Sequence, residues 1–172
     1  LLSEKYPTLI TPLSYNTPMG VSRAIREKLT PTYQVFVGEM GARHVGDIKE
    51  LCRLVKPTIG ILTSVGPQHL DTFRTVQRVV KTKYELIEAL PKDGHGYFFD
   101  DGGICKGLYD QTEKPKSLAS LTSGHGDCWC ENITVSPSGC SFDLHLKNKG
   151  SIRCQTLLLG EHNIQNILLA SM

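Results

Sequence analysis

The chain has 172 residues, of which 40% are hydrophobic and 21% charged, and its formal net charge is +2. This composition is typical of an ordinary globular protein with one domain. A charge so close to zero argues against a nucleic-acid-binding domain, because contacts with phosphate groups need a basic excess. No apolar run approaches the roughly 18 residues that span a bilayer, and no secretory leader is recognisable. The first residue is Leu1 rather than Met, so we expect the chain to be part of a longer protein.

Short apolar runs alternate with helical patterns over the first two-thirds of the chain. The expected helices are 18–29, 46–55 and 75–90, and the expected strands are 8–11, 34–40, 58–65 and 96–100. The second and third strands are almost continuously apolar, which is typical of strands buried on both faces. The alternation predicts an α/β fold with a mostly parallel sheet flanked by helices. We further expect the strands through Val37 and Leu62 to be parallel neighbours in that sheet.

The composition changes after about residue 122. Three short strands are expected at 133–136, 140–146 and 152–159. The sequences Ser-Pro-Ser-Gly and Lys-Asn-Lys-Gly between them are typical of turns, so they predict a small antiparallel meander near the C-terminus. A last helix is expected to begin near His162. The chain would then be a single domain with an α/β part (1–122), an antiparallel part (123–160) and the start of a helix (161–172).

The six cysteines are at positions 52, 105, 128, 130, 140 and 154. A chain of this length needs no disulfides to fold, and we interpret the cysteines as small packing residues on strands. The alternative is a zinc site formed by Cys128, Cys130 and His125, although the Cys-x-Cys spacing differs from that of common zinc-binding loops. Such a site would make the chain a non-catalytic metal- or nucleotide-binding module, and stoichiometric zinc in the purified protein would favour it.

Polar clusters are expected at the carboxyl ends of the parallel strands, where open sheets bind their ligands. These clusters are 14–17, Glu39 and 63–69. Glu39 follows an apolar strand, and a carboxylate there is a frequent Mg²⁺ ligand because it presents hard oxygen atoms from a rigid position. The alternatives are that Glu39 caps a helix or pairs with a basic residue such as Arg43.

Lys83 has an unusual position in the expected helix 75–90. At about 100° per residue it lies within an apolar stripe, whereas Lys81 and Glu85 lie on the opposite face, where charges are usual. The stripe consists of Val76, Val80, Ile87 and Leu90. A cation on such a stripe is costly unless it is paired or neutralised. The Lys83 side chain therefore either extends to the edge of the helix or is a desolvated, reactive amine with a lowered pKa.

Four ordered motifs resemble those of the Mur ligases. Residues 39–42 and 46–48 are similar to the E-x-G-A…G-E-I segment of this family. Residues 63–70 and 82–85 also match, with the family's spacing of fourteen residues between His69 and Lys83. Residues 160–166 are similar to the family's G-x-H-N-x-x-N segment. Within the family, residues 15–20 and the long Glu39 motif are most similar to members that add D-alanyl-D-alanine to a UDP-N-acetylmuramoyl tripeptide.

The resemblance implies a role for each matching residue. Glu39 and His69 would bind Mg²⁺, and Lys83 would carry the family's carbamate, formed when carbon dioxide adds to its neutral amine. The carbamate would replace the cation on the apolar stripe with an anion that also holds the metal, so His69 and Lys83 are the expected catalytic residues. The residues expected to bind the adenine nucleotide are His162, Asn163 and Asn166, and those expected to bind the uridine-nucleotide substrate are Asn16, Thr17 and Gln68.

The resemblance also implies a reaction. The family forms an amide bond through an acyl phosphate, with ATP and Mg²⁺ as cofactors. The expected substrates are a UDP-N-acetylmuramoyl peptide and D-alanyl-D-alanine, in the cytoplasmic synthesis of peptidoglycan precursors, with no nucleic-acid or membrane partner. Another amide ligase of the superfamily, such as a folylpolyglutamate-synthase-like enzyme, is the alternative.

The chain contains no G-x-x-x-x-G-K-[ST] phosphate loop. The family has this loop just before the segment that begins at Leu1, and a further domain after the segment that ends at Met172. We therefore expect a P-loop NTPase-like central domain without its phosphate loop and its C-terminal domain. Such a domain would have an open slot in its sheet and would be inactive alone.

Overall fold

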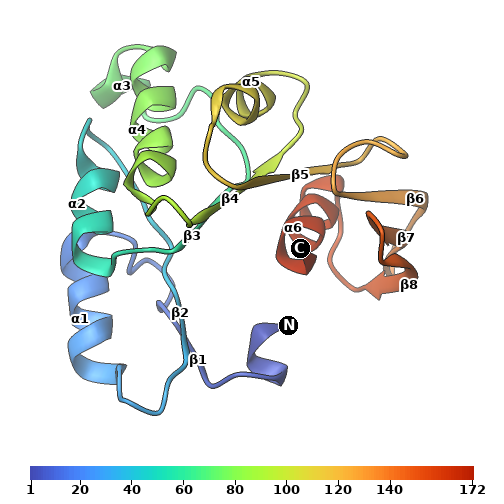
Figure 1. Ribbon diagram of the computed structural model, residues 1–172, viewed down its shortest axis with the longest axis horizontal. Coiled ribbons are helices and arrows are strands. Elements are labelled where there is room, and N and C mark those ends of the chain that lie inside the picture. The colour runs from blue at the N-terminus through green and yellow to red at the C-terminus, as the bar shows by residue number, and fades with distance from the viewer. The chain divides into compact units, whose positions relative to one another are not determined.

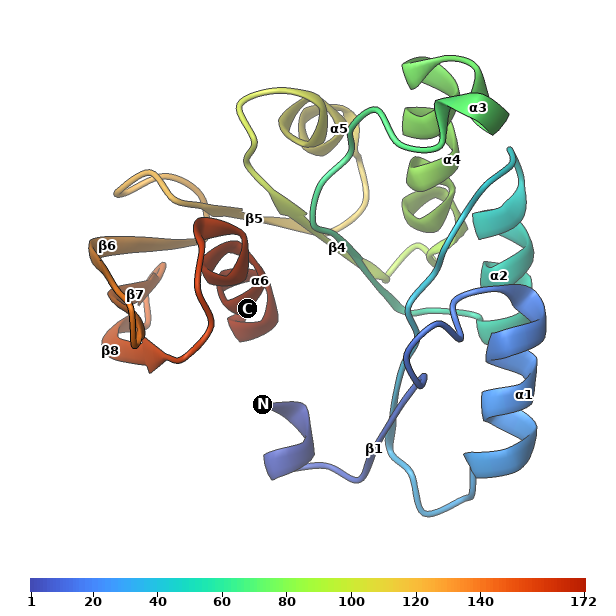
Figure 2. The ribbon, with the colours of Figure 1, turned by 180° about the vertical axis from the view of Figure 1, so that it is seen from behind.

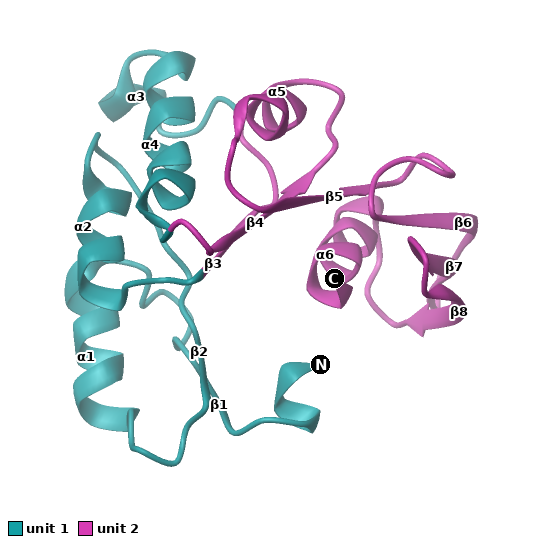
Figure 3. Cartoon of the chain, in the orientation of Figure 1, with its two compact units in different colours: residues 1–58, 66–91 teal, residues 59–65, 92–172 magenta.

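The computed structural model describes residues 1–172 and divides into two compact units. Unit 1 comprises residues 1–58 and 66–91, and unit 2 comprises residues 59–65 and 92–172 (Figure 3). The chain therefore leaves unit 1 for a single strand, returns to it, and then completes unit 2. Every residue expected to hold Mg²⁺ belongs to unit 1, and every residue expected to bind the adenine nucleotide belongs to unit 2.

Unit 1 contains two short parallel strands and three main helices (Figure 1). Its elements are the short 3-10 helix η1 (Leu2–Glu4), β1 (Thr8–Ile10), α1 (Pro18–Lys28), β2 (Val35–Val37), α2 (Asp47–Val55), α3 (Leu70–Phe73) and α4 (Val76–Ala89). The helix α2 packs against both α1 and α4, and α3 packs against α4. The apolar side chains between these helices are buried, among them Val21, Ile48, Leu51, Val79 and Ile87.

Two helices of unit 1, α1 and α4, begin at threonine residues that cap them. The Thr17 hydroxyl accepts a hydrogen bond of 3.2 Å from the amide of Gly20, and Pro18 occupies the first position of α1. The Thr75 hydroxyl accepts one of 3.3 Å from the amide of Arg78 at the start of α4. Threonine at the cap and proline just inside the helix satisfy or remove amides that have no partner within the helix.

Unit 2 is built on a six-stranded sheet in the order β3-β4-β5-β6-β7-β8. Its elements are β3 (Ile59–Leu62), β4 (His95–Phe99), α5 (Ile104–Gln111), β5 (Lys116–Ser120), β6 (Cys128–Ser136), β7 (Gly139–Leu146), β8 (Gly150–Thr156) and α6 (Glu161–Ser171). The strands from β3 to β6 are parallel, and β6, β7 and β8 form an antiparallel meander. The α5 and α6 helices lie on opposite faces of the parallel part (Figure 2). The predicted α/β fold class is thus confirmed, including the meander.

The predicted pairing of the strands through Val37 and Leu62 is wrong. Val37 lies in β2, which pairs with β1, whereas Leu62 lies in β3, which pairs with β4 and forms the edge of the larger sheet. Burial of both faces is also wrong for both strands. No residue of β2 is fully buried and Val37 is exposed, and in β3 Ile59 and Ile61 are exposed while Gly60 and Leu62 are buried. The expected open slot in the sheet and the expected division near residue 122 stay predictions.

The core of unit 2 contains most of the cysteines. Cys128, Cys130 and Cys140 lie on β6 and β7 and are buried together with Phe142 and with Ile164 of α6. Burial raises the pKa of the Cys128 thiol to about 12 and that of the Cys130 thiol to about 11, which favours neutral thiols that pack as apolar groups.

The six cysteines are all free, but they are not all on strands. Cys52 lies in α2 and Cys105 in α5, where the residue packs as a small apolar group on a helix face instead. No group of three or more His, Cys, Asp or Glu side chains in the chain could hold a metal ion. None of the helices combines the length with the apolar character that crossing a bilayer requires.

Candidate functional site

Glu39 lies two residues after β2 and is held at both its backbone and its side chain. Its amide donates a hydrogen bond of 3.1 Å to the Thr11 hydroxyl at the end of β1, and its Oε1 accepts one of 3.0 Å from Nδ2 of Asn16. The side chain is exposed. Glu39 does not cap α2, because the amides at the start of that helix bond to Asp47 and Glu85, and it forms no ion pair with Arg43. An exposed carboxylate held in this way can present its second oxygen to a cation.

Asn16 and Thr17 form the segment between β1 and α1. The Asn16 carbonyl accepts a hydrogen bond of 2.8 Å from the amide of Gly41, so two hydrogen bonds join this segment to the Glu39 loop. The loop approaches Asn16 closely, because a Cβ on Gly41 would lie 2.9 Å from Cγ of Asn16. The Thr17 hydroxyl caps α1. The roles of both residues as substrate contacts stay predictions.

His69 and Gln68 lie in the loop before the short helix α3, and both are exposed. His69 has a positive φ of 50° and is the N-cap of α3, where its carbonyl accepts hydrogen bonds from Thr72 and Phe73. The imidazole is therefore presented outward at the start of a helix that packs against α4, the helix that contains Lys83. The roles of His69 as a metal ligand and of Gln68 as a substrate contact stay predictions.

Lys83 lies in the middle of α4, and its side chain is partly buried. It is therefore neither fully exposed to solvent nor fully enclosed. The Lys81 side chain is exposed, as expected. The placement of Glu85 on a solvent-exposed face is wrong: only 7% of this residue is exposed. Its carboxylate accepts hydrogen bonds of 3.0 Å from the Gly46 amide and 2.9 Å from the Lys49 amide, because α2 packs along that side of α4. Helical periodicity identified α4 but could not identify this partner.

The chemistry of the donor set can be compared with the needs of Mg²⁺. Glu39 and His69 offer an oxygen and a nitrogen donor, but an ammonium group such as that of Lys83 has no lone pair for a metal. A carbamate on Lys83 would add two anionic oxygens. The residues therefore fit a Mg²⁺ site only with the modified lysine, which agrees with the absence of any metal cluster made of His, Cys, Asp and Glu alone.

The residues expected to bind the adenine nucleotide lie at the start of α6 in unit 2. His162 and Asn166 are exposed and four residues apart, which places them on one face of the helix. Nδ2 of Asn163 donates a hydrogen bond of 2.8 Å to the carbonyl of Leu159 and contacts Nε2 of His162 at 3.1 Å. Asn163 therefore holds the chain before the helix, whereas His162 and Asn166 are the side chains available to a ligand.

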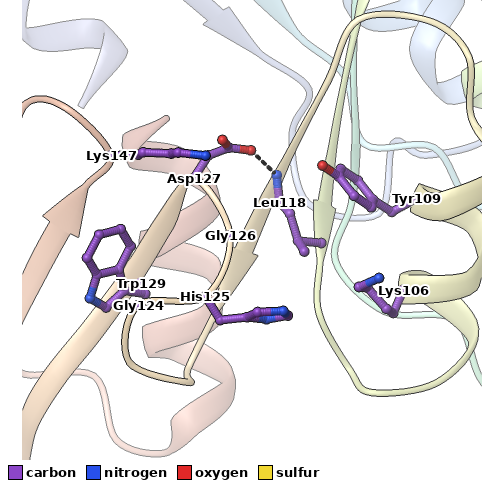
Figure 4. A pocket seen from close by; sticks show the side chains of 9 residues that line it. All are labelled: Lys106, Tyr109, Leu118, Gly124, His125, Gly126, Asp127, Trp129 and Lys147. Atoms are coloured by element: carbon purple, nitrogen blue, oxygen red, sulfur yellow. Dashed lines mark hydrogen bonds between the residues drawn. The ribbon is translucent and has the colours of Figure 1, made fainter.

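A cavity of about 370 Å³ in unit 2 contains none of the residues predicted to bind Mg²⁺, the adenine nucleotide or the uridine-nucleotide substrate (Figure 4). Lys106 and Tyr109 of α5, His125 of the loop before β6, and Trp129 and Lys147 are among its lining residues. The sequence analysis considered His125 only as a zinc ligand. The glycines on either side of it, Gly124 and Gly126, could have indicated a loop that lines a cavity.

Two basic side chains of this cavity, Lys106 and His125, already contact acids. Nζ of Lys106 lies 2.6 Å from Asp110, and Nδ1 of His125 lies 2.8 Å from Asp100 at the end of β4. The zinc interpretation therefore has no support, since His125 contacts an acid and the cysteines expected beside it are in the core.

Several known proteins are similar to this chain. Residues 1–172 match the family described as Mur ligase middle domain. The chain is 30% identical over 172 residues to the UDP-N-acetylmuramoyl-tripeptide–D-alanyl-D-alanine ligase of Escherichia coli (strain K12), a match that covers 99% of this chain and 38% of that protein. It is 30% identical over 116 residues to the UDP-N-acetylmuramate–L-alanine ligase of Dictyoglomus turgidum, covering 66% of this chain and 24% of that protein.

A solved structure agrees with these matches. A crystal structure of MurF from Acinetobacter baumannii has a TM-score of 0.89 and 27% sequence identity, and the match covers 99% of this chain and 37% of that one. The chain thus spans well under half the length of the proteins it resembles. The matched region includes the segments of Glu39, His69, Lys83 and Asn166. On this evidence the chain belongs to the Mur ligase family, and it corresponds to the family's middle domain.

Proposed function

We propose that the protein containing this chain is an ATP-dependent ligase that adds D-alanyl-D-alanine to a UDP-N-acetylmuramoyl tripeptide. The observation that carries this proposal is the 30% identity, over 99% of the chain, to a ligase of that name. The match to a ligase that adds L-alanine covers only 66% of the chain. With ATP and a UDP-linked peptide as reactants, the reaction belongs in the cytoplasm.

The reaction begins with two anions that repel one another. The substrate carboxylate attacks the γ-phosphate of ATP to form an acyl phosphate, and the amine of D-alanyl-D-alanine then displaces phosphate. Catalysis of the first step depends on neutralising charge in a fixed geometry. Mg²⁺ would supply this neutralisation at the phosphate oxygens.

This chain would contribute the groups that hold the reactants. Glu39, His69 and carbamylated Lys83 would hold Mg²⁺, while the hydrogen bond from Asn16 to Oε1 of Glu39 leaves Oε2 as the donor that we assign to the metal. His162 and Asn166 would contact the adenine. Asn163 would orient the loop before α6 through its hydrogen bond to Leu159.

The test uses the full-length protein with ATP, Mg²⁺ and UDP-N-acetylmuramoyl tripeptide. Phosphate release and the mass of the product are measured with D-alanyl-D-alanine, L-alanine, D-alanine or D-glutamate as the amine. We expect both signals only with D-alanyl-D-alanine. Turnover with another amine, or with a folate and glutamate, would contradict the proposal and assign the protein to a different branch of the superfamily.

A further inference from the structure

Glu85 is a buried acid whose partners are backbone amides of another helix. Its carboxylate accepts hydrogen bonds from the amides of Gly46 and Lys49, at 3.0 and 2.9 Å, through its two different oxygens. These amides belong to the N-terminal end of α2, where helix amides have no partner within the helix and the dipole favours an anion. Charge-assisted hydrogen bonds of this kind offset the desolvation of a buried carboxylate. Glu85 therefore joins α4 to α2 at one defined point.

This contact also fixes the loop that follows Glu39. Residues 40–46 connect Glu39 to α2, and Oδ2 of Asp47 accepts hydrogen bonds of 2.8 Å from the amides of Arg43 and His44. Gly46 has a φ of 97°, which favours glycine, and its amide is one of the two bonded to Glu85. Glu39 is thus connected to Glu85 through the short loop 40–46, through the hydrogen bonds of that loop to Asp47, and through the hydrogen bonds of α2 to Glu85.

The same contact limits rotation of α4 about its own axis. Lys83 precedes Glu85 by two residues, so their side chains leave the helix about 200° apart, on nearly opposite sides. Rotation of α4 that moved Lys83 would pull the Glu85 carboxylate away from the α2 amides. A buried acid on one side of the helix therefore limits the directions open to the lysine on the other side.

We propose that Glu85 is a positioning residue that fixes Lys83 relative to Glu39 by capping α2 from α4. This inference rests on the proposed function, in which Glu39 and modified Lys83 hold the same metal. Changes to groups that orient metal ligands typically lower metal affinity by about 10- to 100-fold. We expect the same for Glu85, without any direct contact between its carboxylate and the metal.

The experiment compares full-length wild-type protein with the variants Glu85→Gln, Glu85→Ala and Glu50→Gln. Glutamine keeps one acceptor oxygen but turns an NH₂ group toward an amide that also donates, so one of the two hydrogen bonds is lost. Glu50 is exposed on α2, and Glu50→Gln is the control for removal of one negative charge near the same helix. Thermal unfolding establishes that each variant is folded, and Glu85→Gln remains informative if Glu85→Ala is not.

Two readouts are measured without any peptide substrate. Hydrogen exchange at the amides of Gly46 and Lys49 measures whether their hydrogen bonds to Glu85 are intact. Titration with Mn²⁺, followed by electron paramagnetic resonance, measures metal affinity. We expect faster exchange at these amides and an affinity for Mn²⁺ about 10- to 100-fold weaker in Glu85→Gln, with Glu50→Gln like wild type. Unchanged exchange at these amides in Glu85→Gln would show that Glu85 does not cap α2. Faster exchange with unchanged Mn²⁺ affinity, or a wild type that binds no Mn²⁺, would overturn the positioning role.

A final measurement separates this inference from the proposed function. Ligation of D-alanyl-D-alanine by the wild type is assayed in parallel, as is its dependence on Mg²⁺ concentration in Glu85→Gln. A wild type that binds Mn²⁺ but does not use D-alanyl-D-alanine contradicts the proposed substrate and leaves the effect of Glu85 on the metal measurable. We expect Glu85→Gln to need about 10- to 100-fold more Mg²⁺ for half-maximal activity, and an unchanged requirement would overturn the inference.

Discussion

Nδ2 of Asn16 donates a hydrogen bond of 3.0 Å to Oε1 of Glu39, across 23 residues of sequence. The bond joins the segment that begins α1 to the residue that follows β2. It orients a carboxylate that is otherwise exposed to solvent and free to adopt several rotamers. Asn16, predicted as a substrate contact, therefore also has a structural partner in the candidate metal centre.

Asn16→Ala should weaken metal binding more than it weakens the fold. An exposed hydrogen bond contributes about 1 kcal/mol or less to stability, whereas loss of a group that orients a metal ligand typically lowers metal affinity about 10- to 100-fold. Mn²⁺ titration and urea unfolding of the full-length protein measure the two effects. Equal Mn²⁺ affinity in wild type and Asn16→Ala would exclude a role for this bond in the metal centre.

Gly41→Ala should act through Asn16. The new Cβ would lie 2.9 Å from Cγ and 3.0 Å from Nδ2 of Asn16, so the asparagine side chain has to move and its bond to Glu39 is lost. We expect weaker Mn²⁺ binding in Gly41→Ala and a much smaller effect of the same change in the Asn16→Ala background. A double-mutant cycle measures this coupling, and strictly additive effects would show that the two residues act independently.

Lys83→Ala in the full-length enzyme should lower the rate of acyl-phosphate formation by at least about 10²–10³-fold, because it removes a preorganised anion. A short carboxylic acid, or bicarbonate with a small amine, should partly restore activity by placing an oxygen anion in the vacated space. Lys83→Arg should not be restored, since it fills the space with a permanent cation. Single-turnover formation of ADP measures the rate of acyl-phosphate formation in Lys83→Ala and Lys83→Arg, each with and without the added acid.

Lys81→Ala is the matched control for Lys83, because Lys81 is exposed on the same helix. It should retain wild-type rates. Near-wild-type turnover in Lys83→Ala at saturating Mg²⁺ would show instead that the Lys83 side chain only extends along the edge of α4.

The buried thiols should make the protein less stable at alkaline pH. Burial raises the pKa of Cys128 and Cys105 to about 12 and that of Cys52 and Cys130 to about 11, from a value of 9.0. The folded state therefore keeps protons that the unfolded state releases above pH 9. The stabilising contribution is complete below pH 9 and is lost as the pH rises toward 11–12.

Urea unfolding of the full-length protein at several pH values between 8 and 11 measures this loss. Cys128→Ala should reduce the fall of the unfolding free energy with pH, by up to about 1.4 kcal/mol per pH unit for one thiol. An identical slope in wild type and Cys128→Ala would show that the Cys128 thiol titrates normally in the folded state.

Local sequence signals predicted much of the fold. The helical pattern from Pro18 predicted α1, and the turns around residues 137 and 148 predicted the meander. Helix α5 and strand β5 were missed, because α5 is short and contains Gly107 and because β5 has little apolar periodicity. These signals depend on the residue itself and on its close neighbours in the chain.

Partners that are distant in sequence were not predictable in the same way. The apolar runs at Val37 and Leu62 indicate strands, but nothing in either run specifies its neighbour. A helical projection likewise assigned Glu85 to solvent by its charge, whereas its partners are amides 36 and 39 residues away. The motifs are the reason that Glu39, His69 and Lys83 are predicted as site residues, but they did not predict the hydrogen bonds that hold Glu39.

The position of β3 in the larger sheet has a consequence for synthesis and dissection of the protein. β3 leaves the ribosome in the middle of unit 1, yet its hydrogen-bonding partner β4 begins only at His95. During translation, unit 1 can thus become complete while it still carries a strand whose edge is unpaired. A truncated protein that ends at Pro91 would keep this state permanently, with Leu62 uncovered beside the exposed Ile59 and Ile61. Such an edge invites aggregation, and a cut after β4 would only move the unpaired edge to β4, which pairs with β5.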